Sequence, residues 1–426
     1  MGIKMRQLLT IILLGLSFLF GVQAFAQQIV IDIEGMNPTR RGAMGIITSF
    51  STGLNNVGRG EHVYLSAYDF SGGAVSSVTW EFLSRPAGSA TVFEAVNDTI
   101  TKFLADIVGQ YKIKATVTAS TGSGEAEVEI TAANYTGVEM TTGAMNCGTC
   151  HAGIRDEWKD SRHATLLKRG LDGEVPGYSA TRLRTSTTGI MMDNLQNGSF
   201  GSLMASTGWQ FPTTLQPGNW DAMKTAHPTL ARVGTIGCES CHGAGSQHPM
   251  SGAPSSMTVQ YTSDNCLSCH HNLPNVRPGA QWESSGHGNA VWSNSFRNRP
   301  GNNSLSDCVR CHDGRAYINF TNGLGTNTNQ DVYSQREHVN ISCQSCHDSH
   351  KGGLRATPVG SDTLSNGYSY ASFNAGAGKT CMDCHKYRAN GNTLVNANLS
   401  AHWGPHYGGI ADVLLGKNGY TFGAEI

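Results

Sequence analysis

Residues 27–135 alternate apolar and polar positions with a period of two. Five stretches carry this pattern or a short apolar run, and Gly, Asn and Ser turns separate them: IVIDI, HVYLSAY, SVTWEF, YKIKATVT and AEVEITA. This pattern is typical of half-buried strands bounded by turns. The region contains no stretch of helical period. We therefore predict an all-β, immunoglobulin-like sandwich over residues 27–135, with Trp80 in its core.

A different pattern precedes these strands. Lys4 and Arg6 are followed by the apolar run LLTIILLGLSFLFGV and then by Ala24-Phe25-Ala26, a small-x-small site. This order is that of a secretory signal peptide. A retained membrane anchor is the alternative, but the apolar run is short for a span. We predict a cleaved signal over residues 1–26, a periplasmic or extracellular location, and a protein that is not integral to a membrane.

Beyond residue 136 the pattern predicts short helices joined by long loops. The stretch AGIRDEWKDSRHATLLKRGL repeats apolar residues at near-helical spacing and predicts one helix. Charged residues are 14% of the chain, against about 25% in typical globular proteins. With 52 glycines and 39% hydrophobic residues, side chains alone supply little for one ordinary core. The net charge of −1 gives no reason to expect a nucleic-acid partner.

The cysteines identify what fills the interior. All twelve lie after residue 146, in six C-x-x-C-H motifs. The cysteines are Cys147, Cys150, Cys238, Cys241, Cys266, Cys269, Cys308, Cys311, Cys343, Cys346, Cys381 and Cys384, and the histidines that follow are His151, His242, His270, His312, His347 and His385. This motif attaches c-type haem, because its thiols bind one haem edge and its histidine becomes the proximal iron ligand. Zinc sites or disulfides would not explain a histidine after every pair. We predict six covalently bound c-type haems over residues 136–426.

Further histidines are available as distal iron ligands. The predicted ones are His163, His248, His287, His338, His350 and His406. His163 and His287 end two copies of W-x-x-S-x-H, and His338 also follows an aromatic residue by five positions. Three residues of backbone reach at most about 10 Å, so His350 cannot pass round the macrocycle attached at CQSCH. It should ligate a neighbouring haem. His271, His402 and His227 are the alternatives that we do not choose.

Several of these elements resemble a known family. The W-x-x-S-x-H elements, CESCHGAGSQHP and PHYGGIADVLLGKNGY resemble exported multihaem cytochromes related to hydroxylamine oxidoreductase and to the tetrahaem cytochrome of ammonia oxidisers. The resemblance covers about residues 140–426. It implies that His163, His287, His248 and His406 are distal ligands.

The resemblance also predicts a lost haem site. Similar chains often carry Y-x-x-x-C-x-x-C-H in the long gap between the first two motifs, where this chain has YSATRLRTSTTG. Arg182, Thr185 and Ser186 stand where Cys, Cys and His would be expected. An ordinary polar loop is the alternative. Trp209 and Trp220, later in the gap, are expected to wall off haem edges.

The strand region has a resemblance of its own. VTWEFLSRPAGSA and FLADIVGQYKIKATVTAS resemble bacterial immunoglobulin-like domains of the PKD type. Tyr111, just before a strand, resembles a tyrosine-corner residue. Such domains serve as spacers, docking surfaces or polysaccharide binders, and the fold does not choose among them.

Together these features predict a sandwich followed by a mainly α-helical, loop-rich hexahaem domain. The favoured function is electron relay along closely packed, mostly bis-histidine haems to a redox partner protein or an extracellular acceptor. One alternative is an oxidoreductase that acts on a small nitrogen or sulfur compound at an open haem iron. Another is a homo-oligomer, such as a subunit of a haem filament.

Overall fold

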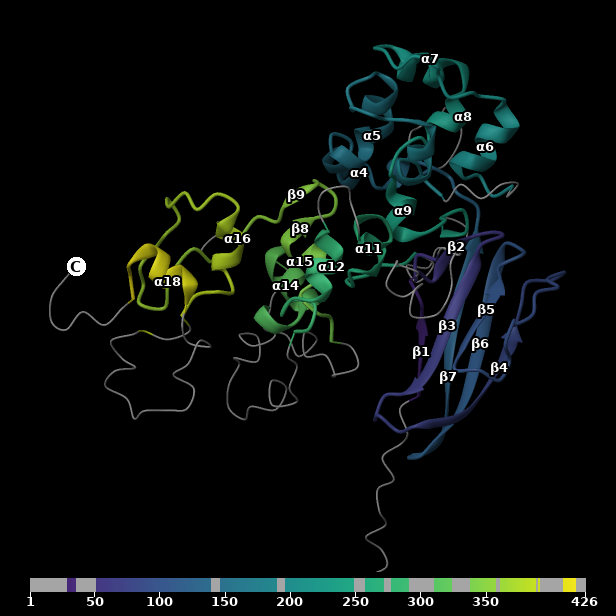
Figure 1. Ribbon diagram of the computed structural model, residues 1–426, viewed down its shortest axis with the longest axis horizontal. Coiled ribbons are helices and arrows are strands. Elements are labelled where there is room, and N and C mark those ends of the chain that lie inside the picture. The colour runs from purple at the N-terminus through teal and green to yellow at the C-terminus, as the bar shows by residue number, and fades with distance from the viewer. Residues whose placement is uncertain are drawn as a thin grey trace, which may run out of the picture. The chain divides into compact units, whose positions relative to one another are not determined.

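The computed structural model places two compact units in this chain (Figure 1). It describes residues 29–35, 51–138, 146–189, 196–248, 257–271, 277–290, 310–323, 338–357, 361–387, 390 and 409–418. The predicted signal segment and His406 lie outside these residues. The first unit contains the described residues up to Glu34 together with Arg59–Ala132, and the second contains those within Gly35–Gly58 and Ala133–Ile426.

The first unit is an antiparallel β structure built from two sheets. Its strands are β1 (Ile29–Ile33), β3 (His62–Asp69), β4 (Val75–Ser84), β5 (Ile100–Leu104), β6 (Gly109–Ala119) and β7 (Gly122–Ala133). One sheet has the order β1-β3-β5, and β7, β6 and β4 follow one another in the other. The five predicted strands are all present, and the described part of this unit contains no helix. The prediction missed β5, because its five-residue sequence ITKFL is too short to show a clear alternating pattern between the turns beside it.

The core of this unit is aromatic. Phe82 stacks on Phe93 with ring centres 4.1 Å apart, and Phe103 meets Phe82 edge-on at 5.3 Å. Trp80 is buried as predicted, and its indole N–H donates to the carbonyl of Asp98 over 2.8 Å. Side chains alone therefore hold this unit together, because large apolar rings fill the space between its strands.

Tyr111 closes one end of the sandwich as the predicted tyrosine corner would. It is fully buried. Its hydroxyl lies 2.8 Å from the Asp106 carboxylate and accepts the N–H of Ile107 over 2.9 Å. Burial raises the pKa of Tyr111 to about 12. The phenol thus ties the loop before β6 to the strand that follows it.

The second unit consists of short helices and loops. Its elements are β2 (Asn56–Gly58), α3 (Cys147–Cys150), α4 (Ala152–Trp158), α5 (Arg162–Leu171), the 3-10 helix η1 (Ala180–Thr185), α6 (Phe200–Thr207), α7 (Asn219–Ala226), α8 (Pro228–Ala231), α9 (Cys238–His242), α11 (Asp264–His270), α12 (Pro278–Glu283), α14 (Gly314–Thr321), α15 (Cys343–Cys346), β8 (His347–Asp348), β9 (Gly353–Leu354), α16 (Gly378–Met382) and α18 (Ile410–Leu415). Helices this short are unstable alone in water, so they depend on what packs against them.

One helix prediction was wrong. The stretch expected to form a single helix forms two, α4 and α5, with a break at residues 159–161. Ser161 begins the second helix, because its hydroxyl accepts the N–H of Ala164 over 3.1 Å. An N-cap serine satisfies an otherwise unpaired helix N–H and so favours a new start at that residue. The apolar period continues across the break, which is why the pattern alone did not reveal it.

Packing in the second unit is divided among small clusters. The largest contains Leu167, Leu171, Tyr178, Leu183, Phe200, Trp209, Trp220, Met223, Leu230, Ala231 and Val233. Trp209 and Trp220 lie in this cluster, so their partners here are other side chains. A second cluster contains Leu364, Tyr370, Met382 and Ala411. Both clusters contain few residues in comparison with the length of the second unit.

The segment Gly35–Gly58 belongs to the second unit although it lies between strands of the first in sequence. Thr258 donates to the side chain of Asn56 over 2.9 Å, and Gln260 donates to the carbonyl of Gly53 over 2.7 Å. The described part of this segment also forms β2 and buries Leu54 and Val57. The domain bounds 27–135 and 136–426 stay predictions.

Candidate haem-attachment sites

The C-x-x-C-H motifs, numbered first to sixth in chain order, occupy single helical turns. The first, second, third and fifth form α3, α9, α11 and α15, and the sixth begins at the end of α16. Residues three apart lie on one face of a helix, so one turn presents both thiols to the same side. Cys308, in the fourth motif, lies outside the described residues.

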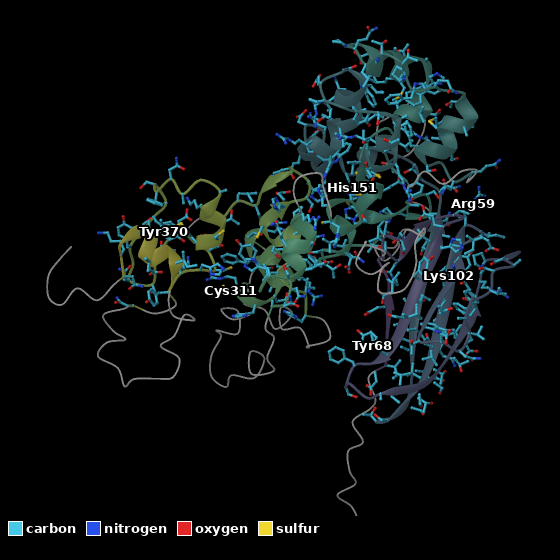
Figure 2. All side chains as sticks on the ribbon, viewed as in Figure 1. Arg59, Tyr68, Lys102, His151, Cys311 and Tyr370 are labelled. Carbon is cyan, nitrogen blue, oxygen red and sulfur yellow. The ribbon has the colours of Figure 1, made fainter. Side chains whose placement is uncertain are left out.

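Several motif side chains are exposed. Cys150, Cys241, Cys269 and Cys381 are exposed, as are the rings of His151, His270, His347 and His385. Figure 2 shows His151 and Cys311 among the side chains of this unit. Apolar thiols are usually buried, so their exposure leaves a surface that a covalently attached group could cover.

Four motif histidines each face a second histidine from elsewhere in the chain. The distances between ring centres are 6.4 Å for His151 and His248, 5.9 Å for His270 and His163, 6.4 Å for His242 and His350, and 6.0 Å for His385 and His287. Each pair joins one predicted proximal ligand to one predicted distal ligand.

These distances fit a metal ion held between two imidazoles. An imidazole nitrogen binds such an ion at about 2.0 Å, and the ring centre lies about 1.1 Å behind the nitrogen, so opposed rings have centres about 6.2 Å apart. Direct stacking would bring the rings closer, and unrelated rings would show no common value. The residues therefore fit an iron with two axial histidines at four motifs.

Hydrogen bonds orient His242 for this role. Its Nδ1 lies 2.7 Å from the carbonyl of Thr258. A carbonyl can only accept, so Nδ1 carries the proton and Nε2 keeps its lone pair for a metal.

The helix break explains how His163 reaches His270. His163 lies in the first turn of α5, directly after the Ser161 cap. Partial burial lowers the pKa of His163, and His270 nearby lowers it further. The neutral imidazole that a metal requires is thereby favoured.

His350 is aimed by a tight turn. The Asp348 carboxylate accepts the N–H groups of His350 over 3.0 Å and of Lys351 over 3.1 Å. The ring consequently faces His242, in a motif far away in sequence, with the ring planes at 17°. Partial burial lowers the pKa of His350.

His248 is positioned by a carboxylate that sequence reasoning missed. Glu239, inside the second motif, is buried and accepts N–H groups from Gly137 over 2.7 Å and Gly245 over 2.8 Å. Gly243, at φ +80°, turns the chain there, and a side chain at this position would collide with Asn56. The clue in the sequence is an acidic residue between two haem cysteines, which has no role in attachment.

The remaining histidines have other contacts. The Nε2 of His338, a predicted distal ligand, lies 2.7 Å from the carbonyl of His312, and His338 lines a cavity between α11 and α12. His271 is buried with its Nε2 3.0 Å from Glu283. The role of His338 stays a prediction, as does that of His406.

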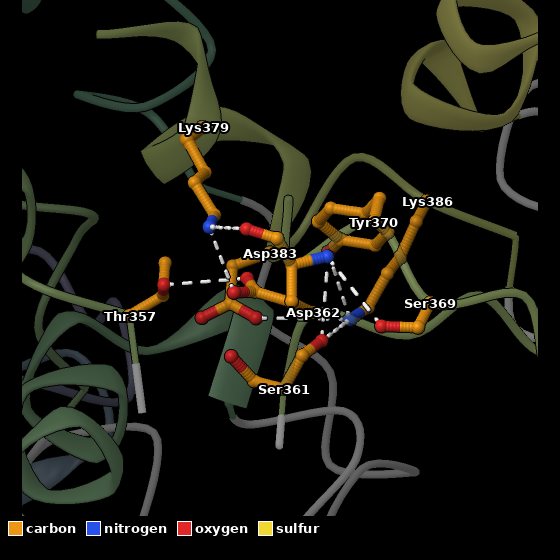
Figure 3. Close-up of polar contacts among 9 residues, drawn as sticks. Thr357, Ser361, Asp362, Ser369, Tyr370, Lys379, Asp383 and Lys386 are labelled. Atoms are coloured by element: carbon orange, nitrogen blue, oxygen red, sulfur yellow. Dashed lines mark hydrogen bonds and ion pairs between the residues drawn. The ribbon is translucent and has the colours of Figure 1, made fainter. Parts of the chain in front are cut away.

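Polar contacts link the sixth motif to the residues around it (Figure 3). Lys386, directly after the motif histidine, donates to the carbonyl of Ser361 over 2.5 Å and to the Tyr370 hydroxyl over 3.3 Å. Asp383, inside the motif, is buried and accepts from the Tyr317 hydroxyl over 3.2 Å. Burial lowers the pKa of Lys386 and raises that of Asp383. A buried carboxylate and a partly buried ammonium group thus lie inside and directly after this motif.

The described residues lack two features that would suggest another kind of site or location. They contain no helix long and apolar enough to cross a membrane. They also contain no cluster of three or more His, Cys, Asp or Glu arranged to hold a metal ion without a further group.

Comparisons with known proteins give a partial match. No protein-family model matches the chain. The C-type polyheme cytochrome OmcB of two Geobacter sulfurreducens strains is 29% identical over 205 residues, which cover 44% of this chain and 25% of the relative. The match thus spans a quarter of the length of these curated relatives. A solved PKD domain from the KIAA 1837 protein aligns over 22% of this chain and all of its own, with 16% identity and a TM-score of 0.17.

The chain therefore has distant similarity to a multihaem c-type cytochrome over part of its length. The narrower resemblance to relatives of hydroxylamine oxidoreductase stays a prediction.

Proposed function

We propose that this chain is an exported hexahaem c-type cytochrome that relays single electrons. The observation that carries the proposal is the set of four histidine pairs at 5.9–6.4 Å. Each pair joins a motif histidine to a distal candidate, and the distances match two axial ligands of one iron. The similarity to a polyheme cytochrome supports the same function.

In this proposal the chain holds, orients and spaces the cofactors. All twelve cysteines bind haem, and His151, His242, His270, His312, His347 and His385 are the proximal ligands. His163, His248, His287 and His350 are distal ligands by their pairing, and His338 and His406 by sequence pattern. The bound haems supply one-electron redox chemistry and the protein sets their ligation and exposure.

Two histidines on one iron argue against catalysis at that iron. With both axial positions filled by imidazole, no position is left for a substrate. Four of the six motifs have such a pair, so an electron carrier is favoured over an oxidoreductase of a nitrogen or sulfur compound. The proposed partners are a redox protein or an extracellular acceptor, outside the cytoplasm.

The test is to purify the chain from a host that attaches c-type haem, quantify haem, and record an electron paramagnetic resonance spectrum of the oxidised protein. We expect six haems per chain, all low-spin. The double variant Cys266→Ser/Cys269→Ser is the matched control and should contain five. A colourless product would refute the proposal, and a high-spin fraction near one sixth would favour the enzyme.

A further inference from the structure

The thiols of different motifs contact one another, and these contacts identify which motifs are neighbours. Three pairs of neighbouring thiols link the first motif to the second, the third to the fifth, and the fourth to the sixth: Cys147 and Cys238, Cys266 and Cys343, Cys311 and Cys384. The Tyr317 hydroxyl, in the helix that follows the fourth motif, also donates to Asp383 of the sixth over 3.2 Å. Two further pairs are close enough to interact electrostatically, Cys241 with Cys269 and Cys346 with Cys381.

Backbone contacts support the same neighbours. The side chain of Asn265, in the third motif, donates to the carbonyl of Cys241 over 2.9 Å. The N–H of Cys343 donates to the Ser263 hydroxyl over 3.0 Å. Each sulfur would hold one of the two attachment points on its haem edge, so neighbouring sulfurs from two motifs bring the edges of two haems together.

The second unit also contains an internal repeat. The first copy runs from the first motif to the second, and the second copy runs from the third motif to the fifth. The first and third motifs read NCGTCH and NCLSCH, each is followed by W-x-x-S-x-H, and the second and fifth motifs read IGCESCH and ISCQSCH. The tryptophans make the same bond in both copies. Trp158 donates to the carbonyl of Ile236 over 3.2 Å and Trp282 to that of Ile341 over 2.7 Å, each two residues before a motif cysteine.

In each copy, the W-x-x-S-x-H histidine faces the histidine of a motif outside that copy. His163 of the first copy faces His270, at the start of the second. His287 of the second copy faces His385, in the sixth motif. The ring planes meet at 54° and 59°, against 24° and 17° in the other two pairs. The sixth motif therefore faces the histidine of the second copy in the same way as the third motif faces the histidine of the first copy.

The fourth motif is the part that the two copies do not share. In the second copy Gly314, two residues after His312, donates to the carbonyl of Val339 over 2.8 Å. In the first copy Thr188, two residues after Ser186, donates to the carbonyl of Val233 over 2.9 Å. Residues 184–186 thus take the place that residues 310–312 hold in the second copy. This is the stretch predicted from sequence to be a lost haem site.

The arginine inside each stretch supports the equivalence. The charge of Arg184 acts on Cys269 of the third motif, and that of Arg310 acts on Cys384 of the sixth. The arginine of the first copy therefore lies near the third motif, and the arginine of the second copy lies near the sixth. The first copy keeps its two motifs in contact without a haem motif at this position.

We propose that the six haem-attachment motifs form one row in the order first, second, third, fifth, sixth, fourth. The fourth is an end of the row, although in sequence it lies between the third and the fifth. This inference rests on the proposed function and adds to it the two ends, at the first and fourth motifs, where partners would exchange electrons. The fifth motif contacts the third directly, so the row from the first to the sixth is continuous without the fourth.

The test copies the first repeat into the second. The variant Cys308→Arg/Cys311→Thr/His312→Ser gives the fourth motif the residues of 182–186. The control Cys266→Ser/Cys269→Ser removes the third haem, which is internal. We would follow the haem methyl signals by nuclear magnetic resonance through a redox titration, because removing a haem shifts the potentials of its immediate neighbours.

The fourth-motif variant should keep five haems, and one of the five should change its midpoint potential. In the control, two of the five should change. Two shifted haems in the fourth-motif variant would overturn the order.

If the fourth-motif variant loses more than one haem, nuclear Overhauser cross-peaks between haems of the unmodified protein test the order instead. Nuclear Overhauser contacts should join the haem of the fourth motif to that of the sixth and not to that of the third. A chain with six low-spin haems but other contacts would refute only the order, whereas a chain without haem would refute the proposed function.

Discussion

His350 lies three residues after one motif histidine, yet its ring faces His242 of another motif. The three-residue reach of the backbone predicts that it serves a neighbour, but it does not say which neighbour. The Asp348 turn decides this, because it directs the ring away from its own motif. At residue scale, then, sequence limits what a ligand can reach and local hydrogen bonds choose among the options.

Replacing His350 by Met should raise the potential of one haem only. A Met/His iron has a higher potential than a bis-histidine iron, so one sixth of the haem should reduce ahead of the rest in a spectroelectrochemical titration. The control is His227→Met, a histidine outside the four pairs, and it should leave the titration unchanged. A titration that His350→Met also leaves unchanged would show that His350 is not a ligand.

Asp69 makes the stability of the sandwich depend on pH. Hydrogen bonds from Ser71, over 2.6 Å, and from Thr121 lower the pKa of Asp69 to about 2. An acid whose pKa falls on folding adds stability that is complete above its unfolded pKa, near 3.8, and is lost as the pH falls towards 2. Hydrogen exchange of peptides from β3 should therefore accelerate over this range. In Asp69→Asn the acceleration should be smaller, and an equal acceleration in both proteins would contradict the assignment.

The helices of the second unit are set by polar details that hydrophobic period does not reveal. The break between α4 and α5 rests on one serine hydroxyl, and that break places His163 at a helix start facing His270. The sandwich strands were easier to predict, because alternation with a period of two extends over most of each strand. The short β5 and the helix break were missed for the same reason, since few residues carry either signal.

The two repeat tryptophans give a prediction at the scale of elements. Trp158→Phe should increase hydrogen exchange at residues 236–242, and Trp282→Phe at residues 341–347. Each variant loses one hydrogen bond, of 3.2 Å or 2.7 Å, which should reduce the local opening free energy by about 1 kcal/mol. Each copy is the control for the other. Faster exchange in both copies from one substitution would contradict the separate bonds, and haem content should stay at six.

At the scale of the whole molecule, the two units differ in what holds them together. The sandwich has a continuous aromatic core. The second unit has small apolar clusters, and several of its motif thiols and histidines are exposed. Because apolar burial is the main favourable term in folding, the proposed haems would supply the missing part of the core of the second unit.

The chain produced without haem attachment should therefore fold only in part. We expect strand peptides of the first unit, such as β6, to keep their protection from hydrogen exchange. Peptides from α11 to α18 should exchange rapidly and be cut by protease. The largest apolar cluster, around Leu167 and Phe200, should retain partial protection. A haem-free chain protected throughout would show that side chains suffice.

By itself the sequence determined the strand-rich first region, and it predicted the attachment chemistry and the set of histidines from which the proposed ligands are drawn. These follow from local spacing. The two thiols and the histidine of a motif lie within five residues, and a strand is recognised from the alternation of apolar and polar residues within it. Only the tertiary structure decided which histidine faces which motif, that Gly35–Gly58 is grouped with the second unit, and which motifs are neighbours. These depend on residues far apart in the chain, whose meeting is set by caps, turns and single hydrogen bonds that no periodic pattern records.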